Sequence, residues 1–147
     1  MMDQVQLEQF LRLVDRDFPV PLSQKQDLKE YSKKLLEKAT LCFVCKDGKI
    51  LSLVAGYTEN LSENMAFITL VATRAEARGR GLAKELVQEF ISLCRKKNIK
   101  AVHLYAVPTN VSAVKMYHKV GFREFYPVNE PRPEDTHLIY YLEDNGR

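Results

Sequence analysis

Residues 78–83, with the sequence Arg-Gly-Arg-Gly-Leu-Ala, constrain the fold more than any other part of this 147-residue chain. They join a β-rich run, residues 65–73, to an amphipathic pattern that begins at Leu82. The two glycines permit tight turns with exposed amides, and the first turn of a helix adds unpaired N–H groups and the positive end of its dipole. The segment therefore predicts a cradle for a phosphate or pyrophosphate, with Arg78 and Arg80 as charged partners. A solvated basic turn that simply begins a helix is the alternative.

Two common phosphate-binding motifs do not fit this segment. A dinucleotide-binding fingerprint needs a third small residue at the position of Lys84 and an acidic residue about 20 positions further on, near Lys100. A P-loop needs Gly-Lys followed by Ser or Thr, whereas Gly81 is followed by Leu-Ala. Both motifs are excluded, and the remaining pattern is Arg-x-x-Gly-x-Ala.

A second segment, residues 110–122, reads Asn-x-x-Ala-x-x-x-Tyr-x-x-x-Gly-Phe. Together the two segments resemble the motifs of the GCN5-related N-acetyltransferases (GNAT). The resemblance extends over about residues 24–142. It departs from the family at the front, where a helical pattern starts close to Met1, so the usual first strand is expected to be missing or very short.

The resemblance implies that acetyl-CoA is the acyl donor, with no metal involved. The implied cofactor contacts are Val71, Ala72 and Thr73 on a strand edge, Arg78, Gly79, Arg80, Gly81, Leu82 and Ala83 in the loop, and Asn110 and Ala113 on the following helix. Tyr117 matches the family's tyrosine near the CoA sulfur, which implies a general acid for the departing thiolate. Because Tyr117 shares a helical face with Ala113 and Val120, a role in core packing is the alternative.

The general base and the acceptor pocket are less well defined. Family members let the amine attack the thioester directly, so an ammonium acceptor must first lose a proton. The candidate bases are Glu59, Glu63, Glu76, His103 and Tyr105. By analogy with the family, residues 18–21, Tyr57 and residues 126–133 are expected to line the acceptor pocket.

Composition and length bound the class of protein. A chain with 46% hydrophobic and 28% charged residues fits one ordinary globular domain, expected over residues 1–147. A net charge of +3 suits an anionic small molecule better than nucleic acid, and the polar start and short apolar runs favour a cytoplasmic protein without a membrane span. Cys42 and Cys45 fall on a predicted strand, where residues three apart face opposite ways, so neither a disulfide nor a zinc site is expected.

The local patterns predict an α/β protein of the α+β type with about four helices. Helices are expected from residue 4 and from Ser23, where Gln26 completes a capping box, and again over 82–97 and 111–119. Strands are expected at 41–45 and 50–57, joined by an Asp-Gly turn, and at 65–73, 101–107, 122–126 and 137–142. The first three strands form an antiparallel meander. The strand–helix–strand order over 65–107 implies a parallel pair, and the change of direction opens a crevice for the cofactor.

Three functions remain at this stage. The first is an N-acetyltransferase for a small-molecule or protein amine. The second is a non-catalytic acyl-CoA sensor or interaction module that keeps the cradle without acceptor chemistry. The third is a polyanion binder that uses Arg74, Arg78, Arg80, Lys84 and residues 95–97. Exposed sheet edges also allow a homodimer.

Overall fold

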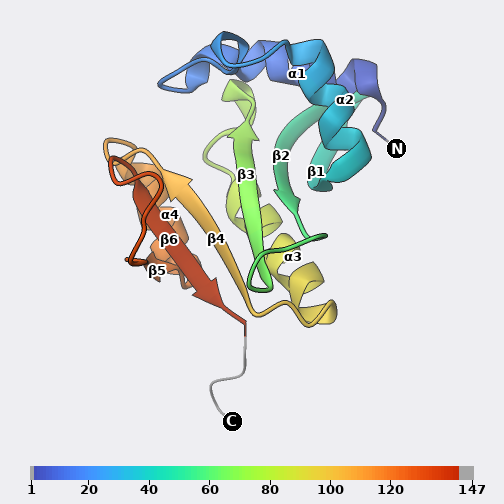
Figure 1. Cartoon of the computed structure of the whole chain (residues 1–147). Coiled ribbons are helices and arrows are strands. Elements are labelled where there is room, and N and C mark those ends of the chain that lie inside the picture. The colour runs from blue at the N-terminus through green and yellow to red at the C-terminus, as the bar shows by residue number, and fades with distance from the viewer. Residues whose placement is uncertain (1, 143–147) are drawn as a thin grey trace.

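Within residues 2–142, which the computed structural model describes, six strands form one mixed sheet flanked by helices (Figure 1). The strand order is β1-β2-β3-β4-β6-β5, with β3–β4 parallel and the other neighbours antiparallel. In chain order the elements are α1 (Gln4–Val14), η1 (Asp15–Asp17), η2 (Leu22–Gln24), α2 (Leu28–Lys38), β1 (Thr40–Lys46), β2 (Lys49–Tyr57), β3 (Met65–Thr73), η3 (Ala75–Ala77), α3 (Leu82–Lys96), β4 (Ala101–Ala106), α4 (Val111–Val120), β5 (Arg123–Glu124) and β6 (Thr136–Tyr141).

This arrangement confirms the predicted mixed sheet, with its antiparallel meander and its parallel pair. In the described part of the chain the first strand is β1, which follows two helices, in line with the helical pattern predicted close to Met1. The Asp47-Gly48 turn joins β1 to β2 with positive φ at both residues, as a two-residue hairpin requires. The ends of the expected domain, residue 1 and residues 143–147, lie outside the described residues.

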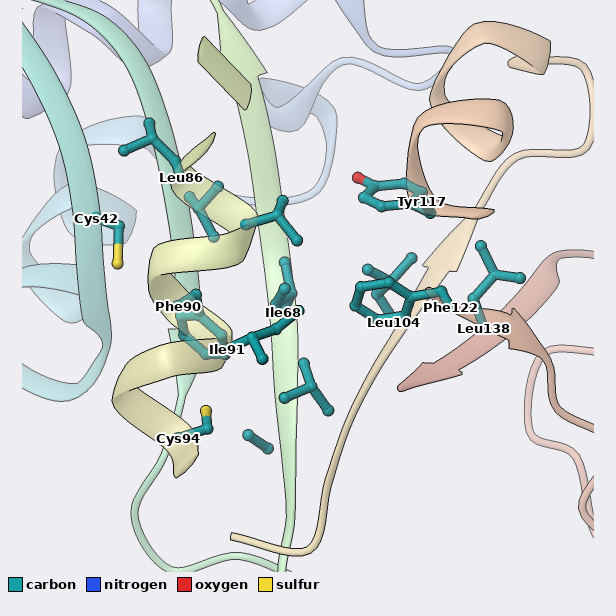
Figure 2. Close-up of a cluster of buried hydrophobic side chains, with 14 of the residues drawn as sticks. Cys42, Ile68, Leu86, Phe90, Ile91, Cys94, Leu104, Tyr117, Phe122 and Leu138 are labelled. Carbon is teal, nitrogen blue, oxygen red and sulfur yellow. The ribbon is translucent and has the colours of Figure 1, made fainter. Parts of the chain in front are cut away.

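Helices cover both faces of the sheet. On one face, α1 and α2 bury Phe10 and Leu35 against Leu53 and other residues of β2 and β3. On the opposite face, α3 packs across β1, β2 and β3, and its Phe90 lies at the centre of a second cluster (Figure 2). A Cβ at Gly56 of β2 would lie 2.5 Å from the Phe90 ring, so this glycine allows the helix to approach the sheet closely. Two hydrophobic layers thus hold the central strands from both sides.

The two cysteines of the CxxC pattern separate as expected. Cys42 is buried in the cluster beneath α3, whereas Cys45 is exposed at the other side of the strand. Figure 2 shows the Cys42 side chain directed toward α3. Their positions follow the alternation of a β-strand rather than the convergence that a shared metal or a disulfide requires.

The N-terminal helices begin at aspartates. Asp3 accepts a bond from the Gln6 amide at 2.8 Å, and the Gln6 side chain accepts one from the Asp3 amide at 2.9 Å, which completes a capping box for α1. The predicted start of the second helix at Ser23 was wrong, because α2 begins after its N-cap Asp27. Ser23 lies instead in the short helix η2.

The reason is a competing partner for Ser23. Its backbone N–H donates to Asp15 at 2.8 Å, and its hydroxyl donates to the same carboxylate at 2.6 Å. The hydroxyl bond lowers the pKa of Asp15. Ser23 therefore fastens the connector to the end of α1 and cannot cap a helix of its own.

The parallel strands β3 and β4 form a fork. They pair over three positions, of which Phe67 opposite His103 is the last, and then spread apart toward their C-terminal ends (Figure 1). Just beyond this point the register between β2 and β3 slips at Thr69, which behaves as a β-bulge. The bulge reverses the faces of β3, because Leu70 then packs under α1 and α2 whereas Val71 packs toward α3. The outer half of β3 consequently has an edge that β4 does not cover.

Candidate active site

A cavity of about 870 Å³ lies at the open end of the fork. It is bounded by the last residues of β3, the loop before α3, the first turn of α3, one side of α4 and the connector after α1. Its lining includes the predicted residues Val71, Ala72, Thr73, Arg78, Gly79, Gly81, Leu82, Ala83, Asn110, Ala113 and Tyr117. Segments far apart in the sequence thus meet here as the motifs predicted, and Arg80 is the one predicted residue that does not line the cavity.

The N-terminus of α3 is built differently from those of the other three α-helices within residues 2–142. Asp3, Asp27 and Asn110 cap their helices through side-chain oxygens, whereas the N-cap of α3 is Gly81, which has no side chain to offer. Gly79 and Gly81 have φ of 80° and 77°, values that favour glycine. The amides of the first turn of α3 consequently face the cavity without an internal acceptor from the cap. This is a geometry that binds anions.

The arginines of the loop are engaged within the protein. The Arg78 guanidinium pairs with Asp17 at 2.6 Å and donates to the Thr73 carbonyl at 3.2 Å. Arg80 donates to the Glu76 carbonyl at 3.2 Å. Arg78 therefore lines the cavity while it ties the loop to the end of β3 and to the connector, and Arg80 stabilises the turn instead of facing the cavity.

Lysines add positive charge to the cavity beside the N-terminus of α3. Lys84 in its first turn, and Lys115 and Lys119 on α4, line the same cavity. Lys115 and Lys119 are four residues apart and share one side of α4. With Arg78 against Asp17, the positive charges around the cavity exceed the negative ones, which suits a ligand with several phosphate charges.

Tyr117 extends from α4 toward β3, with its hydroxyl at the leading end (Figure 2). Its ring packs edge-on against Phe122, and only 6% of the residue is exposed. Burial raises the pKa of Tyr117 well above its usual value, so the phenol is protonated throughout the neutral range. The residue belongs to the core and to the cavity wall at once, so the two roles considered for it are compatible.

Asn110 caps α4 through its side-chain oxygen, which accepts from the Ala113 amide at 3.3 Å. The cap fixes the first turn of α4 beside the cavity, where Asn110 and Ala113 both form part of the lining. The predicted cap is confirmed. The cap uses only the side-chain oxygen of Asn110, so its amide nitrogen can still donate to a ligand. That contact with a ligand stays a prediction.

The acidic candidates for a general base lie at the surface. Glu59 forms an ion pair with Lys97, and the bond from Lys97 lowers the pKa of Glu59. Glu63 is exposed in the turn before β3, and Glu76 is exposed near Arg74. None of these three carboxylates lines the cavity described above.

His103 and Tyr105 of β4 belong instead to a polar network. His103 Nδ1 lies 2.8 Å from His137 Nε2, His137 Nδ1 lies 2.6 Å from Glu130, and the Tyr105 hydroxyl donates to Glu130 at 2.7 Å. The Arg132 amide donates to the same carboxylate at 2.9 Å. The bonds hold the loop between β5 and β6 against the sheet.

The acceptor-pocket residues expected by analogy divide between two places. Phe18 and Pro19 line the main cavity, whereas Tyr126 and Pro127 line a second cavity of about 430 Å³ between β5, β6 and the loop that joins them. Val20 is exposed, and Tyr57 is half-buried at the end of β2. Only part of the expected pocket therefore converges on the fork.

Several lining residues escaped the sequence analysis. Asp17, Lys115 and Lys119 carry no motif, although the four-residue spacing of the two lysines marks one face of a helix. His137 was not weighed as a site residue either, and Glu130 entered only within residues 126–133, which were expected to line the acceptor pocket. The signal for them was the alternation of β4 and β6, which pairs Tyr105 with His137 across the strands.

Comparison with known proteins agrees with this geometry. Residues 7–122 match the model of the Acetyltransferase (GNAT) family. The chain belongs to this family. The GNAT resemblance predicted from residues 78–83 and 110–122 is thereby confirmed, as is the predicted fold class.

Solved GNAT structures share the fold. An acetyltransferase of the GNAT family from Staphylococcus aureus superposes with a TM-score of 0.76 at 18% identity, covering 95% of this chain and 93% of that one. The PaiA N-acetyltransferase from Thermoplasma acidophilum, solved in complex with coenzyme A, gives a TM-score of 0.73 at 15% identity, with 95% of each chain covered.

At the level of sequence, this GNAT chain is 27% identical over 78 residues to the L-2,4-diaminobutyric acid acetyltransferase of Wolinella succinogenes. The match covers 52% of this chain and 45% of that relative, so it spans slightly less than half of the relative's length. Within residues 2–142, no helix is both long and apolar enough to cross a membrane.

Proposed function

We propose that this GNAT protein transfers the acetyl group of acetyl-CoA to a primary amine. The observation that carries the proposal is the uncapped N-terminus of α3, which opens into the cavity beside a free strand edge and Tyr117. An anion cradle, a strip of unpaired backbone and a buried phenol in one cavity match the parts of a long, phosphate-bearing thioester. CoA bound to the related PaiA protein supports the same ligand class.

Three parts of the cavity wall suit three parts of acetyl-CoA. The amides of residues 79–83 would hold the pyrophosphate, helped by the positive charge of Lys84. The open edge of Val71, Ala72 and Thr73 would pair with the amides of the pantetheine arm as an added strand does. Asn110 and Ala113 would form the opposite wall, where the small Ala113 leaves room for the arm.

Acetyl-CoA supplies an activated acyl group, and the protein supplies orientation and proton transfer. We assign Tyr117 as the general acid that protonates the sulfur of the departing thiolate. A buried phenol that keeps its proton at neutral pH is in the correct state for this task. A backbone N–H of the open β3 edge would polarise the carbonyl oxygen.

The acceptor is proposed to be a small amine. The sequence relatives act on L-2,4-diaminobutyric acid, which makes this diamine the first compound to test, although the match spans less than half of those proteins. Phe18 and Pro19 line the main cavity, and Glu130 lies in the loop that lines the second cavity. A compact cationic amine with an apolar stem fits such a mixture.

The test begins with calorimetric titration of the protein with acetyl-CoA, and with CoA alongside, at two salt concentrations. Saturable 1:1 binding that salt weakens only modestly is expected, because backbone and apolar contacts contribute beside charge. Release of CoA thiol is then followed with L-2,4-diaminobutyrate and a wider panel of primary amines. Binding without turnover on any amine would favour the acyl-CoA sensor, and a steep loss of binding with salt would favour a polyanion binder.

A further inference from the structure

The polar side chains of β4 and β6 form a chain of hydrogen bonds in which each group donates toward Glu130. Tyr105 pairs with His137, and His103 with Ile139, across neighbouring antiparallel strands. The His103 and His137 rings lie 5.0 Å apart, and Tyr105 stacks on His137 at 4.1 Å. His137 has a side chain only 5% exposed, and the carboxylate of Glu130 is 18% exposed. Such close and enclosed groups fix one another's protons.

The carboxylate sets the order of donors. Burial opposes ionisation of Glu130, but bonds from Tyr105, the Arg132 amide and His137 outweigh it and lower its pKa to about 2. An ionised carboxylate only accepts, so His137 Nδ1 carries the hydrogen that is donated to Glu130. We take His137 as neutral, so that its other nitrogen, Nε2, accepts from the donor that faces it, His103 Nδ1–H.

This order leaves His103 with an unprotonated Nε2. Desolvation, together with the neighbouring His137, lowers the pKa of His103 to about 4, so the ring is neutral at physiological pH and Nε2 holds a lone pair. Phe67 from β3 and His137 from β6 pack against the His103 ring, and Tyr105 lies two residues further along the same face of β4. Glu130 is the charged group behind His137, and Arg132 lies over the Tyr105 ring at 4.6 Å.

His103 also occupies a particular place in the fold. It stands opposite Phe67 at the last paired position of β3 and β4, which is the point of the fork. Val102 and Leu104 on either side of it pack into the cluster under α3 and α4, so His103 faces the opposite side of the sheet from Tyr117. His103 lines neither of the two cavities, so an amine would have to approach it from the sheet face opposite Tyr117.

We propose that His103 is the general base that takes a proton from the acceptor ammonium, and that His137 and Glu130 act behind it as positioning residues. The inference rests on the proposed acetyl transfer. The imidazolium formed at His103 would be short-lived, because burial and His137 lower the pKa of His103 to about 4 and the Glu130 charge opposes that shift only in part.

The protons balance as follows. A primary ammonium gives one proton to His103 Nε2, and the imidazolium later returns it to solvent. The freed nitrogen forms a bond to the acetyl carbon, and the carbon–sulfur bond breaks with its electron pair on sulfur. The nitrogen then loses a second proton as the amide forms, which balances the proton that the thiolate takes up.

Histidine tautomers provide a test that needs no acceptor. The chain has three histidines, so ¹⁵N spectra of histidine-labelled protein bound to CoA can be assigned with His103→Gln and His137→Gln. The expected result at neutral pH is an Nδ1–H tautomer for both His103 and His137. An Nε2–H tautomer at His103 would overturn the proposal, because no lone pair would then be available at that atom.

Turnover measurements distinguish a general base at His103 from a residue that only supports the structure. L-2,4-diaminobutyrate is a protonated amine at neutral pH, whereas hydroxylamine is largely neutral and needs no base. His103→Gln should lower kcat roughly 100-fold with the diamine and only a few-fold with hydroxylamine. Glu130→Gln should follow the same pattern more weakly, and Glu134→Gln, the same change at an exposed site in the same loop, should match the wild type.

An equal loss on both amines would overturn the relay alone, since it would mean that the network only supports the loop. A wild-type protein that binds acetyl-CoA but acetylates neither these two amines nor any other of the panel would overturn the proposed function, and the relay with it. Turnover by the wild type therefore tests the proposed reaction, and the ratio of the kcat losses on the two amines tests the role of His103.

Discussion

Replacement of Gly81 by glutamate is the sharpest test of the anion cradle. Gly81 is the N-cap of α3 with φ of 77°, and a Cβ built there meets no atom within 4 Å among the described residues. A side chain therefore fits in space but strains the backbone, at a cost of about 1–2 kcal/mol in the free energy of unfolding. The carboxylate would stand where the pyrophosphate is expected.

The loss of affinity should be far larger than this strain. Two unit charges about 4 Å apart repel by roughly 4 kcal/mol at an effective dielectric constant of about 20, which corresponds to almost 1000-fold in Kd. Solvent near the exposed loop reduces the effect, so we expect acetyl-CoA to bind Gly81→Glu at least about 100-fold more weakly. Calorimetric titration at low and moderate salt measures this directly, and salt should relieve part of the penalty.

Gly48 offers a matched control. It lies in the β1–β2 hairpin with φ of 76°, also with open space around a built Cβ. Gly48→Glu should lose a similar free energy of unfolding in urea, since the backbone strain is the same, yet bind acetyl-CoA as the wild type does. Unchanged affinity in Gly81→Glu, or an equal loss in both variants, would refute the assignment of the α3 N-terminus as the cradle.

Three further perturbations test other parts of the structure. Tyr117→Phe should lower kcat roughly 10- to 100-fold while the Kd for acetyl-CoA stays within a few-fold, and full turnover in steady-state assays would leave Tyr117 as a packing residue only. Gly56→Ala should destabilise the fold by about 2–3 kcal/mol in urea unfolding, because the new Cβ would lie 2.5 Å from the Phe90 ring; a loss below about 0.5 kcal/mol would mean that α3 can shift. On acidification, the free energy of unfolding should fall in two stages. The pKa of His103 is about 4 in the folded state and near 6.5 in the unfolded state, so the unfolded state binds more protons between these pH values. Up to about 2 kcal/mol of stability is lost there, after allowance for solvent screening. The depressed pKa of Glu130 extends the loss below pH 4.5, and unfolding of His103→Gln that shows the same slope between pH 6.5 and 4 would contradict this account.

Features fixed by local sequence could be predicted, as two segments illustrate. The Asp47-Gly48 hairpin and the whole of β3, residues 65–73, follow from turn chemistry and a continuous β-rich run. The loop at residues 78–83, which we propose as the anion cradle, could also be located, because glycine at positive φ followed by a helix is a local arrangement. At Ser23, by contrast, the local capping signal lost to a bond with Asp15, eight residues earlier, which no periodicity reveals.

The network that we propose for the acceptor side could not be predicted because its contacts are long-range. His103 lies 34 residues from His137, and Tyr105 lies 25 residues from Glu130. Their meeting depends on the register of β4 against β6 and on the loop that returns Glu130 over the sheet. The sequence offered His103 and Tyr105 as two residues on one strand face, and only the strand pairing turned them into a directed network.

The fork explains why the two halves of the proposed reaction are recognised so unequally. On the donor side, a cofactor of fixed chemistry needs glycine amides, a helix end and an open strand edge, all of which come from backbone and leave short motifs. On the acceptor side, the residues come from side chains on β4, β6 and a loop, where many different sets could take up a proton. The bulge at Thr69 and the end of pairing at Phe67 separate the two sides at one point of the sheet. In the proposed reaction a substrate held by the first set reaches His103 through that point, so a variant that closed the fork should abolish transfer while leaving acetyl-CoA binding intact.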